Sequence, residues 1–232
     1  DGRLVRGEED VLNELDENAV EAAVALAEEA DGEVIALTMG PEDAEDGVRR
    51  ALQMGADSGV VVADDDLAGA DVVTTARVLA AAIERIGKVD LVVTGMASLD
   101  SMTSMLPGAL AAALHLPAVT LANRLEVDGG AVTVTRIVGT VREVLSAPLP
   151  ALVSVTDQAN EPRYPNFAAM RAAKKKPIDF WDVSELGLQI AEPAVAVVDD
   201  EARPAREAGI IRTDAGEAGR ELATWLVENK LV

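Results

Sequence analysis

The sequence predicts an α/β protein with a doubly wound, mostly parallel sheet, a small antiparallel hairpin and an extended C-terminal arm. Short apolar runs alternate with longer segments whose apolar residues recur every three or four positions, as in parallel strands joined by helices. A glycine turn then separates two strand-like runs, which is typical of a hairpin. Beyond Gly187 the chain is rich in alanine, proline and acidic residues and shows no clear period.

Asn13 or Asp16 can cap the first helix, which we expect to run to about Ala30. Its apolar residues are three and four positions apart and therefore form one face. Asp31-Gly32 ends this helix, and short apolar runs then alternate with helical segments. We expect strands at residues 33–38, 59–63 and 90–94, and helices from the Gly40-Pro41 turn to about Met54, at residues 71–86 and at residues 105–114.

The pattern changes from Leu121 onward. Residues 125–127 and 131–138 are expected to pair as a hairpin around Asp128-Gly129-Gly130, and residues 141–146 can add a third antiparallel strand. Residues 151–155 again have the pattern of a buried strand. The last expected element is a helix at residues 216–229, whose Leu222, Trp225 and Leu226 lie on one face.

These elements divide the chain into a Rossmann-like domain of residues 1–186 and an arm of residues 187–232. A doubly wound domain usually begins with a buried strand, whereas this sequence opens with a polar turn and a helix. We therefore expect the first strand either to lie elsewhere in the fold or to precede residue 1.

The composition excludes several classes of function. A net charge of -21 repels nucleic acid and anionic membranes. The acidity is explained either by a solvated surface or by steering of a basic partner. The sequence contains no cysteine, no secretory signal pattern at its start and no apolar run near the roughly 20 residues of a membrane span. We therefore expect a cytoplasmic protein without direct membrane insertion.

Two loops fall where an open parallel sheet binds ligands, at the carboxyl ends of strands. One is Thr38–Pro41 and the other is Gly95–Pro107, whose small hydroxyl residues precede a helix. The N-terminus of a helix can bind a phosphate, but serine and threonine at this position also serve as ordinary helix caps. Since no glycine-rich phosphate loop is present, the sequence leaves both interpretations open.

The remaining polar groups do not form a catalytic pattern. His115 is the only histidine and has no carboxylate at a motif spacing, and Asp64–Asp66 has the composition of a solvated loop rather than a cation site. The methionines are typical core residues. The sequence therefore predicts neither a hydrolase nor a metalloenzyme.

The segment Asn160–Trp181 differs from the rest of the chain. It holds four of the five aromatic residues and five of the twenty basic side chains. An aromatic side chain beside fixed positive charge is a common way to bind a protein partner. Residues 1–163 contain no aromatic residue, so a flavin ring bound here would need much of its surroundings from another subunit.

Three stretches resemble the beta subunit of electron transfer flavoprotein: NELDENAVEAAVAL, TMGPEDAEDGVRRALQMGAD and NEPRYPNFAAMRAAKKKP. The likeness covers nearly the whole chain and is strongest over residues 11–62 and 148–181. Members of this family usually begin with a strand and a short loop that are absent here, and the resemblance thus implies that the sequence starts late.

The resemblance implies a non-catalytic electron-transfer subunit that forms a heterodimer with an alpha subunit. In that family the alpha subunit holds most of a redox-active FAD. The beta subunit binds AMP structurally, or a second FAD in bifurcating relatives. The pair carries electrons from acyl-CoA and related dehydrogenases, as in fatty acid oxidation, toward a membrane quinone reductase.

The resemblance also implies a set of cofactor-binding positions. Asn13 matches an adenine-nucleotide contact, Leu15 a position near the flavin and Met39 the loop after a strand. The phosphate-binding turn falls on the loop that begins at Gly95, with the expected contacts Asp100, Thr103, Ser104, Met105 and Leu106. Here the chain departs from the family, because Ser104-Met105-Leu106 replaces Asn-Gln-Thr. Two phosphate-binding side chains are thereby lost, and AMP, FAD and an empty site all stay open.

Residues 160–176 resemble the recognition loop that anchors an apolar side chain in a dehydrogenase. Phe167 takes the anchor position, and its burial on docking would contribute about 1.5–3 kcal/mol. The alternative is that Phe167 packs inside the chain. The expected partner-binding residues are Tyr164, Phe167, Met170, Lys174, Lys175 and Lys176, the lysines steering acidic partners.

Two other classes of function fit the alternating fold. A nucleotide-binding sensor of the universal-stress type would bind ATP as a homodimer, although the missing glycine-rich loop disfavours it. An interaction scaffold would hold no ligand. The nucleotide content of the native protein separates these alternatives.

Overall fold

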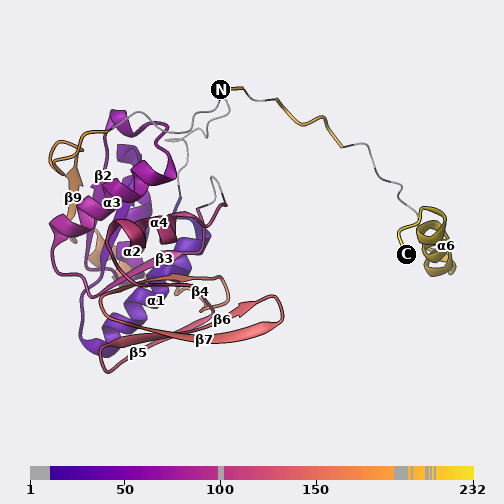
Figure 1. Cartoon of the computed structure of the whole chain (residues 1–232), viewed down its shortest axis with the longest axis horizontal. Helices are drawn as coiled ribbons and strands as arrows, with labels where there is room; N and C mark the ends of the chain where they lie inside the picture. Colours follow the sequence, from indigo (N-terminus) through magenta and orange to yellow (C-terminus); the bar gives the residue numbers. More distant parts are fainter. Residues whose placement is uncertain are drawn as a thin grey trace. The chain divides into compact units, whose positions relative to one another are not determined.

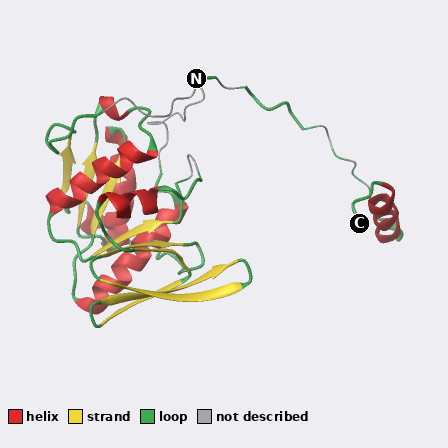
Figure 2. Ribbon diagram, in the orientation of Figure 1, coloured by secondary structure: helices red, strands yellow, loops and turns green. Residues whose placement is uncertain are grey.

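The computed structural model describes residues 11–98, 102–190, 198–199, 201–206, 209, 211 and 213–232. Asp100 lies outside the described residues. The chain forms two compact units, one ending at Val197 and the other holding Val198–Val232. The larger unit contains all the strands that the structure describes (Figures 1 and 2).

Two three-stranded parallel sheets form the centre of the larger unit. The first has the order β1 (Ile35–Met39), β2 (Ser58–Val62), β9 (Ile178–Trp181), and the second has the order β3 (Leu91–Gly95), β8 (Ala151–Val155), β4 (Ala118–Ala122). Every residue of β8 is buried, as expected for a middle strand covered on both faces.

An antiparallel sheet forms from β5 (Arg124–Asp128), β6 (Ala131–Val138) and β7 (Val141–Pro148). Gly129 and Gly130 make the tight turn between β5 and β6, with φ of 58° and 81°, a conformation that favours glycine. Val132 and Val134 of β6 are fully buried in a cluster with Val153 of β8. The antiparallel sheet thus packs against the second parallel sheet.

Helices cover both faces of the parallel sheets. On one face, Ala19 of α1 (Glu14–Ala30) packs in the cluster of Val153, and Leu52 of α2 (Glu45–Met54) packs with Val61 of β2. On the other face, α3 (Val72–Ile86) packs over both sheets and α4 (Leu106–Ala113) covers Leu152 of β8. This is the doubly wound arrangement that the sequence predicts.

Two short 3-10 helices, Glu42–Ala44 and Asp65–Leu67, follow the carboxyl ends of β1 and β2. Among the described residues, no helix combines the length and the apolar character that crossing a membrane requires.

The C-terminal unit contains α6 (Ala218–Glu228). The Asp214 carboxylate accepts hydrogen bonds from the Gly216 and Ala218 amides at 2.7 and 3.1 Å and so begins the helix. Leu222, Trp225 and Val227 are exposed at 57%, 45% and 63%. These apolar side chains of α6 are therefore exposed to solvent and are not covered by other described residues of this unit.

The α/β class, the hairpin and the terminal helix are confirmed, but sequence analysis missed β4, the short helix α5 (Phe167–Ala173) and β9. Both strands are only four or five residues long and follow a proline, Pro117 or Pro177. Such short runs show no period by which to recognise them. In addition, Leu188 and Ile190 pack on the core, so the packed domain continues past residue 186.

Candidate functional site

The carboxyl end of β3 is tied to the start of α1. The Asn13 side chain caps this helix by accepting a hydrogen bond from the Leu15 amide at 3.2 Å. Its Nδ2 donates to the Ala97 carbonyl at 3.1 Å and to Asp16 Oδ2 at 3.0 Å. Asp16 Oδ1 in turn accepts from the Gly95 amide at 3.0 Å. Helix start and strand end therefore form one polar junction.

Gly95 is required by this close approach. A Cβ at this position would lie 2.6 Å from Asp16 Oδ1 and 2.8 Å from the Leu15 carbonyl oxygen. Both distances are shorter than side-chain carbons tolerate, and one of the neighbours is backbone. The junction of Asn13, Leu15, Asp16 and Gly95 therefore depends on the missing side chain.

Asp16 is a buried carboxyl at this junction. Burial raises its pKa above the ordinary value of 3.8, and the hydrogen bonds from Asn13 and Gly95 oppose that rise by favouring the charged form. Asp16 lies in the first turn of α1, and its two oxygens accept from the Asn13 side chain and the Gly95 amide of its own chain. Its role in the junction is thus structural.

The loop before α4 follows β3 and faces solvent. Thr103, Ser104 and Met105 are exposed, and Met102 and Ser104 have positive φ values of 50° and 53°. Within the described residues, no hydrogen bond from Thr103 or Ser104 caps α4, and Met105 at its N-cap position provides none. Pro107 in the first turn of α4 has no N–H, so the Leu106 and Gly108 amides are the donors that this helix start can offer an anionic ligand. The described Thr103 and Ser104 therefore do not make the ordinary cap that sequence analysis left as an alternative.

Thr94 adds a second open polar group at the end of β3. In the part of the chain that the structure describes, its Oγ1 is the one buried side-chain oxygen or nitrogen without a hydrogen-bond partner. A buried hydroxyl without a partner is unusual, because desolvation is then not compensated. An uncapped helix start and an orphaned hydroxyl fit a polar ligand such as an adenine nucleotide.

Two other expected cofactor residues, Met39 and Leu106, pack away from the junction of α1 and β3. Met39 ends β1 in the first parallel sheet and packs with Val62 and Val78. Leu106 begins α4 and packs against the cluster that contains Leu152. The structure therefore brings Asn13, Leu15 and Gly95 together and leaves Met39 in the core of the other sheet.

The segment of residues 160–176 forms a second candidate site, on the face covered by α1 and α2. Asn166 caps α5 by accepting from the Ala169 amide at 2.9 Å, and buried Pro165 precedes it. Phe167 is the first residue of this helix and is 88% exposed. Phe167 thus projects from the chain, and the alternative that it packs internally is wrong.

The neighbouring side chains differ in exposure. Tyr164 is also 88% exposed, with the Arg50 guanidinium 5.6 Å from its ring centre. Met170 is half-buried, whereas Lys174 and Lys175 are exposed. A shallow depression of about 470 Å³ is lined by Phe167, Ala168, Arg171, Ala172 and Lys175. An aromatic ring and cations thus share one exposed surface.

Lys176 does not belong to this exposed surface. Its ammonium donates to the carbonyls of Leu52, Gly55 and Ala56 at 3.2, 3.3 and 2.5 Å. These carbonyls end α2, so the lysine serves as a cap of that helix. Sequence analysis grouped it with Lys174 and Lys175 because neighbouring lysines cannot be distinguished without the fold.

Phe180 and Trp181, the last two aromatic residues of the segment, do not lie on the exposed surface of Tyr164 and Phe167 but in a strand. Phe180 and Trp181 lie in β9 and pair with Val61 and Val62 of β2. Trp181 packs on the core, with the Arg85 guanidinium 4.6 Å from its ring centre. The aromatic cluster of the sequence therefore divides into an exposed pair and a pair built into the sheet.

The groups that sequence analysis set aside have structural places. His115 takes a positive φ of 54° just past the end of α4. Asp64 accepts hydrogen bonds from the Asp66 and Val183 amides at 3.0 and 3.1 Å. No group of histidine or acidic residues suited to a metal ion occurs among the described residues.

Sequence analysis missed three residues of these sites: Thr94, Arg163 and, except as a helix cap, Asp16. Asp16 and Arg163 depend on partners far away in the sequence, Gly95 for Asp16 and Glu21 for Arg163. The one available signal was the position of Thr94 at the end of an apolar strand, where an unpaired hydroxyl is adjacent to the expected ligand loop.

Comparison with known proteins identifies the family. The electron transfer flavoprotein domain matches residues 1–186 of the chain. The electron transfer flavoprotein beta subunit of Mycobacterium bovis is 37% identical over 232 residues, covering 96% of this chain and 87% of that protein. The chain belongs to the electron transfer flavoprotein family.

More distant relatives agree with this assignment. The beta subunit of Bacillus subtilis is 33% identical over 224 residues, covering 95% of this chain and 87% of that protein. A protein of Acetobacterium woodii named as the CarD subunit of a caffeyl-CoA reductase-Etf complex is 35% identical over 189 residues, covering 81% and 72%. Membership of the electron transfer flavoprotein family, on the beta-subunit side, implies a flavin and pairing with an alpha subunit.

Proposed function

We propose that this beta subunit joins an alpha subunit to shuttle electrons from acyl-CoA-type dehydrogenases, by way of an FAD held mostly by the alpha subunit, to a membrane quinone reductase. In this proposal the chain makes and breaks no covalent bonds. Its own residues dock the dehydrogenase and bind an adenine nucleotide, either AMP or the corresponding part of a second FAD.

The exposure of Phe167 is the observation that carries the docking role. Phe167 is 88% exposed at the start of α5, so its ring contributes little burial to the fold of this chain. The ring can be buried against a partner, where it would stabilise the complex. Arg171, Lys174 and Lys175 surround Phe167 with positive charge on a chain whose net charge is -21. This local reversal of charge favours an acidic partner surface.

A CoA-thioester dehydrogenase is the class of partner that the relatives support. One relative is named as a subunit of a caffeyl-CoA reductase-Etf complex, and such a reductase acts on a CoA thioester. The alpha subunit is supported by the beta-subunit names of the relatives. The quinone reductase is carried over from the family resemblance and belongs to the proposal alone.

The nucleotide role rests on the carboxyl end of β3. The Leu106 and Gly108 amides at the start of α4 would receive phosphate, Thr103 and Ser104 would add hydroxyls, and Thr94 would gain the partner that it lacks. The flavin supplies the electron-carrying ring. Since residues 1–163 contain no aromatic residue, this chain offers that ring little stacking surface, in agreement with an alpha subunit that holds it.

Phe167→Ala tests the docking role in the purified heterodimer. We expect the flavin content to stay that of the parent, and the rate at which an acyl-CoA dehydrogenase reduces the complex to fall roughly tenfold or more, the loss of about 1.5–3 kcal/mol. Equal rates for variant and parent would reject docking through Phe167. A purified heterodimer without flavin absorbance would reject the electron-carrier role itself.

The nucleotide role has a separate test. The heterodimer is denatured and the released small molecules are identified by chromatography and mass spectrometry. One AMP, or a second FAD, per beta subunit supports the proposal. Release of the alpha subunit's FAD alone would show that the end of β3 binds no nucleotide.

A further inference from the structure

We infer that Arg163 and Lys176 are positioning residues that fix the two ends of the docking segment on α1 and α2, so that Phe167 is presented before any partner binds. The inference deepens the proposed docking role and rests on it. It assigns the third lysine of the segment a different task from its two neighbours.

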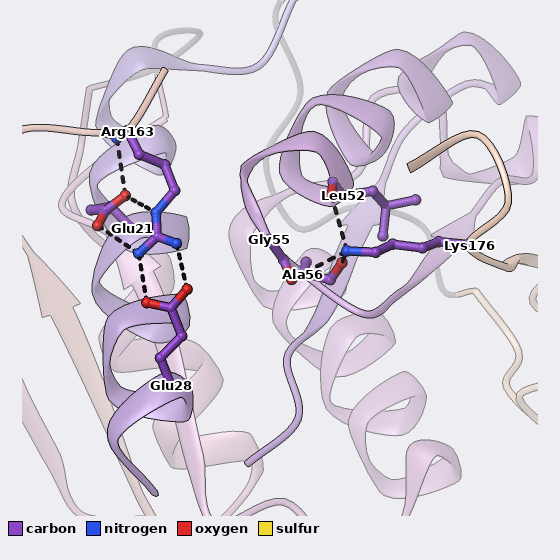
Figure 3. A network of polar contacts seen from close by, with 7 residues as sticks. All are labelled: Glu21, Glu28, Leu52, Gly55, Ala56, Arg163 and Lys176. Carbon is purple, nitrogen blue, oxygen red and sulfur yellow. Dashed lines mark hydrogen bonds and ion pairs between the residues drawn. The ribbon is translucent and has the colours of Figure 1, made fainter. Parts of the chain in front are cut away.

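Arg163 fixes the first end on α1 (Figure 3). Its Nε and Nη2 donate to the two carboxylate oxygens of Glu21 at 2.8 and 3.0 Å, and its backbone amide donates to the same side chain at 2.9 Å. Nη1 and Nη2 also donate to Glu28, at 2.6 and 3.1 Å. Glu21 and Glu28 lie on one face of α1, seven residues or about two turns apart, and one guanidinium binds both carboxylates.

Arg163 and the two glutamates shift each other's pKa. The two carboxylates hold the pKa of Arg163 above its ordinary value, and the guanidinium lowers the pKa of Glu21 and of Glu28. A neighbouring amide pair adds to the same end. Asn160 Nδ2 donates to the Asn18 carbonyl at 2.9 Å, and buried Asn18 donates back to the Asn160 carbonyl at 3.0 Å.

Lys176 fixes the second end on α2 (Figure 3). Its ammonium donates to three carbonyls at the C-terminus of α2, where backbone oxygens lack helical partners and the helix dipole is negative. The Lys176 amide donates to the Ala173 carbonyl at 3.1 Å, so the lysine is joined directly to the end of α5. Movement of α5 away from α2 would break these contacts.

The part between the two anchors has little other support. Ala173 is the one buried side chain of α5, and it packs on Leu52 of α2. A helix of seven residues is far too short to be stable by itself. Fixing its ends in advance lowers the ordering cost that docking would otherwise carry.

Lys174 and Lys175 are matched controls for Lys176, since they are adjacent, have the same side chain and are exposed. A steering charge acts through solvent and is screened by salt, whereas an anchor acts through short contacts inside the chain. The substitution Lys176→Met keeps the aliphatic stem and removes only the ammonium. It is compared with Lys174→Met and Lys175→Met.

The test uses the complete heterodimer and an acyl-CoA dehydrogenase that reduces the parent complex. For Lys176→Met we expect at least tenfold faster hydrogen exchange of the α5 amides and a roughly tenfold higher KM for the heterodimer. The kcat and the salt dependence of KM should stay those of the parent. The two controls should reduce the salt dependence and leave exchange unchanged.

The inference would be overturned if Lys176→Met left the hydrogen-exchange rate of the α5 amides at the value of the parent and reduced the salt dependence of KM. The lysine would then be a steering charge. Arg163→Lys gives an independent readout at the other end, since lysine cannot bind both carboxylates through a fork. It should also speed exchange in α5, and parental exchange would count against the anchor. If Phe167→Ala had the KM of the parent, docking through Phe167 would be rejected, but the inference on Arg163 and Lys176 would not. The hydrogen-exchange rate of the α5 amides tests these two anchors without any dehydrogenase present.

Discussion

Gly95 shows how one residue determines the junction between α1 and β3. A methyl group there would meet Asp16 Oδ1 at 2.6 Å and the Leu15 carbonyl oxygen at 2.8 Å. The Leu15 carbonyl is backbone and cannot move without shifting the start of the helix. We expect Gly95→Ala to lower the free energy of unfolding by about 1–3 kcal/mol, as overpacking does. Urea unfolding measures this change.

Gly108 is the matched control for Gly95. It lies in α4, and a Cβ there would have no neighbour within 4 Å. Gly108→Ala should therefore be neutral or stabilise by up to about 1 kcal/mol, because alanine favours helix more than glycine does. Similar losses for the two variants would show that Gly95 has no special place.

The ion pair of Glu21 with Arg163 makes the stability of the fold depend on pH. The hydrogen bonds with Arg163 lower the pKa of Glu21 below the ordinary value of 4.5, so the charged form stabilises the folded state above that pH. The stabilisation is lost as pH falls through the lowered pKa. We expect Glu21→Gln to be less stable than the parent at pH 7, with a difference that closes below about pH 4.5.

The measurement is urea unfolding of both proteins at a series of pH values from neutral to acidic. Glu29→Gln serves as the control, since Glu29 is exposed on the same helix. A constant difference between Glu21→Gln and the parent at every pH would contradict the ion pair as its cause.

At the scale of elements, the sequence predicts best those segments whose own pattern decides their structure. The helices α1 and α3 and the hairpin of β5 and β6 carry caps, periods or glycine turns within themselves. By contrast, β9 pairs with the edge of β2, and α5 has only seven residues, with a local cap at Asn166 and a packing contact with α2. Tertiary partners of this kind leave no local pattern in the sequence.

The same distinction holds for the two candidate sites. The aromatic and basic composition of residues 160–176 distinguishes the proposed docking segment in the sequence, and Phe167 is exposed as expected. The sequence could not separate Lys176 from Lys174 and Lys175, because only the fold brings the end of α2 within reach. The cofactor positions stay predictions, with the junction at Gly95 and the open start of α4 as their structural support.

The cap of α5 gives a prediction for this element. Asn166 accepts a hydrogen bond from the Ala169 amide, and loss of such a cap costs about 1 kcal/mol. We expect Asn166→Ala to raise the KM of the heterodimer for dehydrogenase reduction by about fivefold, with little effect on global unfolding. Asn166→Ser keeps a cap and should behave as the parent. A parental KM for Asn166→Ala would show that helix order at this point does not limit docking.

At the scale of the whole molecule, the chain consists of two compact units with different amounts of core. The larger unit buries its aliphatic clusters on both faces of two parallel sheets, whereas α6 of the smaller unit contains no buried residue. Exposed Leu222 and Trp225 on a helix without buried residues are the kind of apolar surface that a partner protein covers. The alpha subunit implied by the family is the partner that we propose for it.

Truncation after Gly209 tests this division of the chain. Since the chain divides into two compact units and the truncation removes residues of the smaller one alone, we expect the larger unit to unfold at the same urea concentration as in the parent. Affinity for the alpha subunit should fall by roughly thirtyfold or more, because a buried tryptophan at an interface typically contributes 2 kcal/mol or more. Trp225→Ala in the full chain should give a large part of the same loss, and Glu221→Ala, a polar change on the same helix, should give little. Parental heterodimer affinity for the truncated chain, measured by titration with the alpha subunit, would show that the smaller unit has another task.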